Sequence, residues 1–344
     1  MKNATLLLPY LILLSLVPPA NGAVGGTVVA WGYNASGQTN VPAGLSGVVA
    51  VSAGWQHSVA LKADGTVVAW GTNEFGQLNI PPGLNGVAAI ASGHSHILAL
   101  RTNGTVVAWG RNVEGNSNVP AGLTEVKAIA AGGHISMALK TNGTVVAWGG
   151  TVTAPTNVSV MAAGSIFSTP VFATNGSGVA ALAVGGMRVV TLRNDGTILD
   201  SGSGAPTGLS GITAVSVGIS DDHVLVLKND GTVVTWGGSP SFPEVGIVPV
   251  GLRGVTAIAA GGLHSLAVVT EIPFTFGNIN LYAGTTLTGP VGQPFRVDYA
   301  DVLTPGVTNW FVLTNITLPS SPYLVIDPSS AGQTKRFYRA VPLP

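Results

Sequence analysis

The side chains best suited to chemistry in this 344-residue chain are a set of histidines and one acidic cluster. Histidines precede similar apolar segments at four places: His57, His96, His223 and His264. Imidazole can bind a metal ion or move a proton near neutral pH, so the placement of these rings decides which role is open to them. Asp221 and Asp222 directly precede His223 and form the one acidic and imidazole cluster in the sequence.

An internal repeat must position these residues. Its clearest mark is Gly-Thr-Val-Val-Ala-Trp-Gly at 65–71, which returns with small changes at 26–32, 104–110, 143–149 and 231–237. After it come an Asn- and Gly-containing loop, a Val-Pro-Ala-Gly-Leu segment, and two apolar segments. Asn-Gly and Asp-Gly pairs then join one unit to the next, which is typical of tight hairpin turns. The pattern therefore predicts antiparallel β-sheets repeated along the chain.

Seven copies of the first apolar segment occur, at 48–54, 87–93, 126–132, 158–164, 179–185, 212–218 and 255–261. A period of 39 residues separates the first repeat tryptophans, and repeats of this length build rings or solenoids. We interpret the chain as an all-β, seven-bladed β-propeller over 24–270. Residues 27–41 complete the last blade and close the ring. Blade four is predicted to be a two-stranded stub of 158–164 and 168–173, with Pro170 in its edge strand. In blade one, a poor outer strand is predicted near 77–80.

The signatures Ala-Ile-Ala-Ala-Gly, His-Ser-Leu-Ala-Leu-Lys and Asp-Gly-Thr-Val-Val-Ala-Trp-Gly resemble the regulator of chromosome condensation repeat family. This resemblance covers residues 25–270 and implies a seven-bladed propeller. The tract at 37–43 looks most like secreted bacterial members, among them a propeller that inhibits β-lactamases. Nuclear members catalyse nucleotide exchange on a small GTPase and dock on chromatin. This chain lacks their basic tail, so that activity is not carried over.

Composition and the two ends of the chain narrow the function. The 14 basic and 14 acidic residues balance, which excludes the basic stripe that nucleic-acid binding requires. A charged start, an apolar segment at 4–17 and small residues at 20–23 predict a signal peptide over 1–23, and hence a secreted, periplasmic or cell-surface protein without membrane insertion. Residues 271–344 have a different pattern and are interpreted as a small C-terminal β-module, for attachment, sorting or stabilisation.

The histidines are predicted to be structural. Other repeats place Ile135, Phe167 and Arg188 at the same position, so packing and hydrogen bonding to a neighbouring blade explain it better than catalysis. One position repeated around a ring also separates these imidazoles too far for bonds of about 2 Å to one metal ion. A wedging role between blades is likewise predicted for the repeat tryptophans Trp31, Trp70, Trp109, Trp148 and Trp236.

The loops that vary between repeats are the predicted binding face. In an antiparallel meander, the first-to-second and third-to-outer loops lie at the same end of each blade. Aromatic and arginine side chains on rigid loops are favoured at protein interfaces. The candidate residues are Tyr33, Trp55, Gln56, Glu74, Phe75, His94, Arg111, Glu114, His134, Asp221, Asp222 and Phe242.

We therefore predict a secreted, noncatalytic, monomeric propeller that binds an unidentified extracytoplasmic protein and needs no cofactor or metal. Two alternatives stay open. One is inhibition of a secreted enzyme such as a β-lactamase. The other is a carbohydrate-binding or hydrolytic propeller, for which only Glu74, Glu114, Asp221 and Asp222 offer the carboxylates that glycoside hydrolysis needs.

Overall fold

The computed structural model describes residues 25–150, 152–153, 156–163 and 170–270, and the strands 284–287, 294–300, 311–317, 323–326 and 337–342. The chain divides into two compact units, Met1–Ile272 and Pro273–Pro344. The predicted signal peptide at 1–23 lies outside the described residues. In the described part, no helix is long and apolar enough to cross a membrane.

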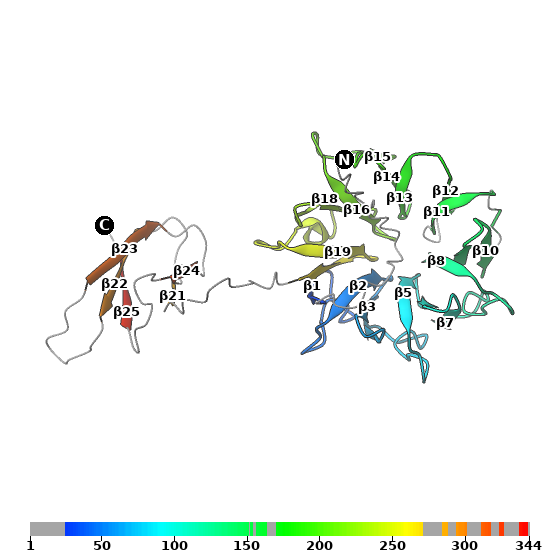
Figure 1. The fold of residues 1–344 in the computed structure, drawn as a ribbon, viewed down its shortest axis with the longest axis horizontal. Coiled ribbons are helices and arrows are strands. Elements are labelled where there is room, and N and C mark those ends of the chain that lie inside the picture. Colours follow the sequence, from blue (N-terminus) through cyan, green and yellow to red (C-terminus); the bar gives the residue numbers. More distant parts are fainter. Residues whose placement is uncertain are drawn as a thin grey trace, which may run out of the picture. The chain divides into compact units, whose positions relative to one another are not determined.

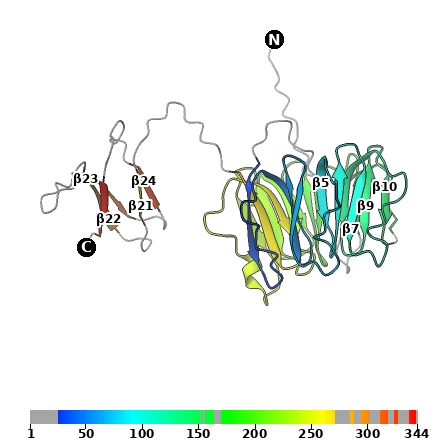
Figure 2. The same ribbon diagram turned by 90° about the horizontal axis from the view of Figure 1, so that it is seen from below.

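The described residues of the first unit form small antiparallel sheets arranged around a common axis, as Figure 1 shows face-on and Figure 2 from the side. The predicted all-β propeller architecture is confirmed. Seven sheets are present, and we number them as blades: β2-β3-β4, β5-β6-β7, β8-β9-β10, β11-β12, β13-β14-β15, β16-β17-β18 and β19-β20-β1. The strands are β1 (Thr27–Gly32), β2 (Val48–Ala53), β3 (His57–Lys62), β4 (Val67–Gly71), β5 (Val87–Ser92), β6 (His96–Arg101), β7 (Val106–Gly110), β8 (Val126–Ala131), β9 (Ser136–Lys140), β10 (Val145–Trp148), β11 (Val158–Ala162), β12 (Val171–Thr174), β13 (Val179–Val184), β14 (Val189–Arg193), β15 (Ile198–Asp200), β16 (Ile212–Val217), β17 (Val224–Lys228), β18 (Val233–Trp236), β19 (Val255–Ala260) and β20 (His264–Val269).

The first strand of the chain belongs to the last sheet. β1 pairs antiparallel with β20, from Thr27 opposite Val269 to Gly32 opposite His264. Just before β1, Gly26 also exchanges two backbone hydrogen bonds with Val48 at the start of β2, at 2.8 and 2.9 Å. The N-terminal segment thus connects blade seven to blade one.

Two expectations about the outer strands are wrong. Residues 77–80 form no strand, because the Asn73 side chain bends the segment into a loop: its Oδ1 accepts from the Leu78 N–H at 2.8 Å, and its Nδ2 donates to Asn79 at 3.1 Å. Pro170 precedes the edge strand rather than lying within it, since β12 begins at Val171. Part of the predicted strand at 168–173 lies outside the described residues.

A left-handed residue stands directly before every innermost strand. At all seven positions φ lies between 58° and 73°. Glycine reaches this region at no steric cost, whereas other residues are strained there. Five of the positions are glycine and two are not: Gly47, Gly86, Glu125, Asn157, Gly178, Gly211 and Gly254.

The second unit is described here only by its strands. β21 (Gly284–Leu287) pairs with β24 (Tyr323–Ile326). β22 (Pro294–Ala300) lies between β23 (Phe311–Thr317) and β25 (Phe337–Pro342). These segments coincide with the alternating patterns from which a C-terminal β-module is predicted.

The left-handed positions yield a stability prediction. Glu125→Gly should raise the free energy of unfolding by about 0.5–1 kcal/mol, because relief of the left-handed strain exceeds the extra flexibility of glycine in the unfolded chain. Denaturant unfolding measures this effect. The control is Glu125→Gln, which also removes the exposed Lys140 pair at 3.4 Å but keeps the strain. A glycine variant no more stable than the glutamine variant would contradict the prediction.

Candidate binding face

The two sets of variable loops lie on the same side of the blades. The backbone N–H of Thr72 donates to the Gln56 carbonyl at 2.9 Å, and that of Arg111 donates to Ser95 at 2.9 Å. In blade seven the Tyr33 N–H donates to Leu263 at 2.8 Å. In these three blades, the third strand is therefore tied, where it ends, to the loop between the first two strands. This arrangement agrees with one shared loop face.

The repeat tryptophans join neighbouring blades beneath this face. The indole N–H of Trp70 donates to the Gln38 carbonyl at 2.9 Å, and Trp109 and Trp148 repeat the contact to Gln77 and Asn116 at 2.9 Å. Each acceptor lies in the outer loop of the preceding blade. All five repeat tryptophans are buried, with 6–8 % of their surface exposed. Buried indoles with a satisfied N–H hold the loops at fixed positions.

The histidines form a second connection between blades. His264 Nε2 lies 2.9 Å from the Ser58 hydroxyl of the next blade, and His96 Nε2 lies 2.9 Å from Ser136. Ser58 in turn donates to the Gln38 carbonyl at 2.7 Å, the same oxygen that Trp70 uses. Because the hydroxyl proton points to that carbonyl, the imidazole Nε2 must carry the proton and donate to the serine.

His57 is the exception, and the sequence explains it. The residue after His96 is Ile97, where blades one, three and seven have serine, so His57 finds no hydroxyl on blade two. Neither of its ring nitrogens has a hydrogen-bond partner among the described residues. The imidazole packs against Gly54 so closely that a Cβ there would meet the ring's Cε1. Burial lowers the pKa of His57, His96 and His264 to about 3 in each case.

These buried imidazoles predict acid sensitivity. Their pKa lies below the ordinary value of 6.5, so between pH 6.5 and about 3 the unfolded chain binds protons that the folded chain does not. The free energy of unfolding is unaffected by these histidines above pH 6.5. Below that pH it falls by about 1.4 kcal/mol per pH unit for each histidine.

Denaturant unfolding at pH 7, 6, 5 and 4.5 measures this loss. His96→Ile, which copies Ile135 of the next blade, should reduce the pH slope below pH 6 by the contribution of about one proton. Parallel curves for the two proteins would show that His96 is protonated equally in both states.

Six of the predicted residues form one continuous group on blades one to three, which we call the aromatic strip: Trp55, His94, His134, Glu114, Arg111 and Phe75. The Trp55 and His94 rings lie 4.2 Å apart, and the His94 and His134 rings 6.1 Å apart. His134 Nδ1 lies 3.5 Å from Glu114, which pairs with Arg111 at 2.6 Å. The Arg111 guanidinium lies over the Phe75 ring at 5.5 Å. Burial, with the nearby His134 and Arg111, lowers the pKa of His94 to about 4.

The strip presents apolar surface to solvent. Trp55 is 38 % exposed and Phe75 44 % exposed, and Val113, beside Arg111 in the chain, is 77 % exposed. Gln56 follows Trp55, and Glu74 precedes Phe75 on the same loops. An aromatic surface on loops whose backbone is held by indoles and strand ends is suited to bind a partner without rearrangement.

The remaining predicted residues lie elsewhere. Tyr33 and Phe242 pack edge to face at 5.3 Å beside blade seven. The Asp222 carboxylate accepts from the Met187 N–H at 2.9 Å. Asp221 departs from the prediction of a surface role: its side chain is 2 % exposed and bonds His223. Asp221 lies inward because its partner His223 reaches Ser265 of blade seven, at 3.1 Å. Among the described residues, no group of three or more potential ligands is placed to hold a metal ion.

Sequence reasoning missed a buried ion pair in blade five. Arg188 occupies the histidine position, and its guanidinium forms two hydrogen bonds to Asp200, at 2.8 and 2.7 Å. The Trp236 indole donates to the same carboxylate at 2.9 Å. Asp200 thus replaces the loop carbonyl of other blades, and Arg188 replaces the imidazole. The arginine at the position that holds histidine in other blades is the sequence feature that could have indicated this ion pair.

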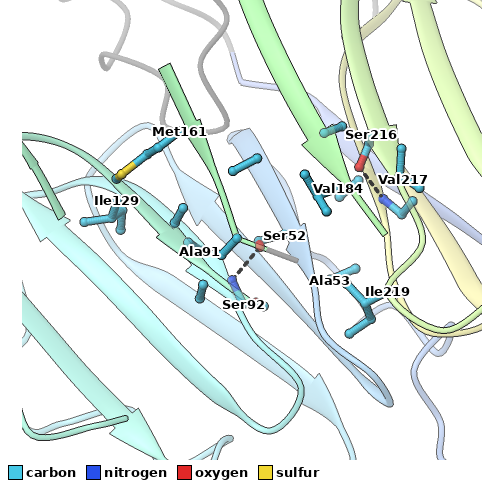
Figure 3. A pocket seen from close by; sticks show the side chains of 17 residues that line it. Ser52, Ala53, Ala91, Ser92, Ile129, Met161, Val184, Ser216, Val217 and Ile219 are labelled. Atoms are coloured by element: carbon cyan, nitrogen blue, oxygen red, sulfur yellow. Dashed lines mark hydrogen bonds between the residues drawn. The ribbon is translucent and has the colours of Figure 1, made fainter. Parts of the chain in front are cut away.

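The axial channel is narrow. It is lined by innermost strands of several blades, mostly through alanine, serine and valine, and encloses about 70 Å³. The Ser52 hydroxyl accepts from the Ser92 N–H, and Ser216 accepts from Ala260, each at 2.9 Å (Figure 3). Ligand pockets usually enclose about 300–1,000 Å³, so the channel is small for a substrate site. The hydrogen bonds along it join neighbouring blades.

Comparison with known proteins identifies the repeat. The regulator of chromosome condensation (RCC1) repeat model matches residues 48–77, 87–116 and 126–150. Each match runs from an innermost strand into an outer loop, and the first two end at Gln77 and Asn116. No curated protein sequence matches the chain.

A solved structure with a TM-score above 0.5 agrees on the fold. The ectodomain of the receptor kinase CR4 from Physcomitrella patens has a TM-score of 0.51 at 19 % identity, covering 71 % of this chain and 79 % of that chain. Prp20p from Saccharomyces cerevisiae has a TM-score of 0.47 at 14 % identity, covering 73 % and 93 %.

The fold therefore defines a β-propeller. Within this propeller, residues 48–77, 87–116 and 126–150, in blades one to three, are similar to RCC1 repeats. The resemblance to secreted bacterial members stays a prediction.

Proposed function

We propose that this protein is a secreted, noncatalytic propeller that captures an extracytoplasmic partner protein through the aromatic strip. The observation that carries the proposal is the geometry of the strip. Two half-exposed rings, Trp55 and Phe75, are joined by the contacts through His94, His134, Glu114 and Arg111. Aromatic anchors within a polar surround are the usual composition of binding hot spots.

Rigidity of the loops supports the same proposal. Beside Phe75, Gln77 Oε1 accepts from the Phe75 N–H at 2.9 Å, and the Gln77 carbonyl accepts the Trp109 indole of blade two. Trp55 is held by a backbone bond from its N–H to His94 at 3.2 Å. Ordering the loops in advance reduces the entropy that binding must offset.

A hydrolytic role receives less support. Glycoside hydrolysis needs two carboxylates that face one cleft. Glu114 is neutralised by Arg111, Asp221 is buried against His223, and Asp222 is engaged by the Met187 N–H. The secreted location is supported by the signal-peptide pattern at 1–23.

The proposal predicts that Trp55→Ala with Phe75→Ala abolishes partner capture from the native secreted fraction. Loss of two interface anchors should weaken binding at least about 100-fold. The melting midpoint should stay within a few degrees, since neither ring belongs to a blade core. Met187→Ala is the control, because Met187 is 81 % exposed and lies outside the strip. Equal capture by the double variant and the wild type would refute the proposal.

A further inference from the structure

A groove opens on the side of the propeller opposite the loop face, under blades four to six. It encloses about 830 Å³ and is lined by the hairpin turns of blades four and five and the starts of β13 and β16. This volume lies within the range of ligand sites. Nothing fills it beside Gly176 and Gly178, where an added Cβ would meet no atom within 4 Å.

The groove lies at one of the two blade junctions that lack a connecting segment present at the other five. At five blade junctions, a Pro-x-Gly-Leu segment leads to the next innermost strand, and its leucine packs on the apolar cluster between the two blades. The segments are 42–45, 81–84, 120–123, 206–209 and 249–252. Between blades four and five, only residues 175–178 connect β12 to β13. The cluster at that junction has five buried residues, fewer than at any other junction described.

The missing segment has a defined shape in the other blades. Its glycine has a positive φ, from 74° to 82°. In four copies the leucine N–H donates to the proline carbonyl, at 3.1–3.2 Å, as in Leu45 to Pro42. Proline followed two residues later by such a glycine is a type II turn, which is ordered before it binds. At five blade junctions, a Pro-x-Gly-Leu turn of the chain itself therefore packs on the cluster between the two blades.

The lining of the groove suits the same group. Its apolar part includes Val179, which packs on the cluster between blades four and five, and Leu192 and Ile212, which belong to the cluster between blades five and six. Its polar part includes Asn175, Asn194 and Asn229. Side-chain amides both donate and accept hydrogen bonds, so they match the polar groups of a peptide backbone. Among the described residues, aromatic rings do not line the groove, which favours a peptide over a sugar.

We propose that this groove binds a Pro-x-Gly-Leu turn presented by a partner protein. The leucine enters between blades four and five, where the chain supplies none of its own, and the asparagine amides bond the backbone of the turn. The site lies on the opposite side from the aromatic strip, so it is a second, independent binding site.

The test uses the full chain and a labelled peptide, acetyl-Val-Pro-Ala-Gly-Leu-Ser-amide, which copies residues 41–46. Fluorescence anisotropy should give a Kd on the order of 0.1–1 mM, as expected for a short peptide that buries one anchor. Replacing its leucine by aspartate should weaken binding at least about tenfold, because the apolar contact is lost. No binding at several millimolar, or equal binding of both peptides, would overturn the proposal.

Two variants test the location. Ser159→Lys places a charge in the groove at the junction of blades four and five and should weaken binding at least about tenfold. Thr256→Lys changes the equivalent residue of blade seven and should bind like the wild type. Equal affinities of both variants would overturn the proposed location.

Nuclear magnetic resonance of the wild type gives the same answer if Ser159→Lys fails to fold. The side-chain amide signals of Asn175, Asn194 and Asn229 should shift on titration, while those of Asn34 and Asn73 on the loop face stay unchanged. Shifts confined to the loop face would overturn the proposal. The Trp55→Ala, Phe75→Ala protein should still bind the peptide, so failure of the loop-face proposal is distinguishable.

Discussion

The propeller depends on one carbonyl oxygen at each junction between intact blades. In blade one, the Gln38 carbonyl accepts the Trp70 indole at 2.9 Å and the Ser58 hydroxyl at 2.7 Å, and Ser58 accepts from His264 of blade seven. The oxygen lies in a loop of the preceding repeat. Two donors on one buried acceptor satisfy polar groups that would otherwise destabilise the core, since each unpaired group costs about 1–3 kcal/mol. The same bonds fix the loop.

This coupling explains why one face is both rigid and variable. The carbonyl group belongs to every residue type, so Gln77 and Asn116 serve equally as acceptors. Neighbouring loop residues are then free to differ, and Phe75 and Glu114 differ two residues before these acceptors. Blade five keeps the connection by other means, because Asp200 supplies the acceptor as a carboxylate, and Arg188 neutralises it at 2.7 Å.

Much of this arrangement can be predicted from the sequence, because the repeat carries it. The strand predicted at 48–54 is β2, Val48–Ala53, and the histidines are buried at every repeat position that holds one. The repeat pattern does not predict the burial or contacts of residues that occur in only one blade. Asp221 was expected at the surface, yet the reach of His223 to Ser265 on another blade draws it inward. The loop at 77–80 was expected to be a strand, but hydrogen bonds of one asparagine side chain decided otherwise.

The first segment of the chain holds the first and last blades together. Deleting residues 27–41 removes both β1, which completes blade seven, and the Gln38 carbonyl, which binds Trp70 and Ser58 of blade one. Calorimetric unfolding of this deletion variant measures the consequence directly. We expect the single cooperative transition of the propeller to be lost, together with protection of the β2 and β19 amides from hydrogen exchange. An unchanged melting midpoint with one cooperative transition would contradict it.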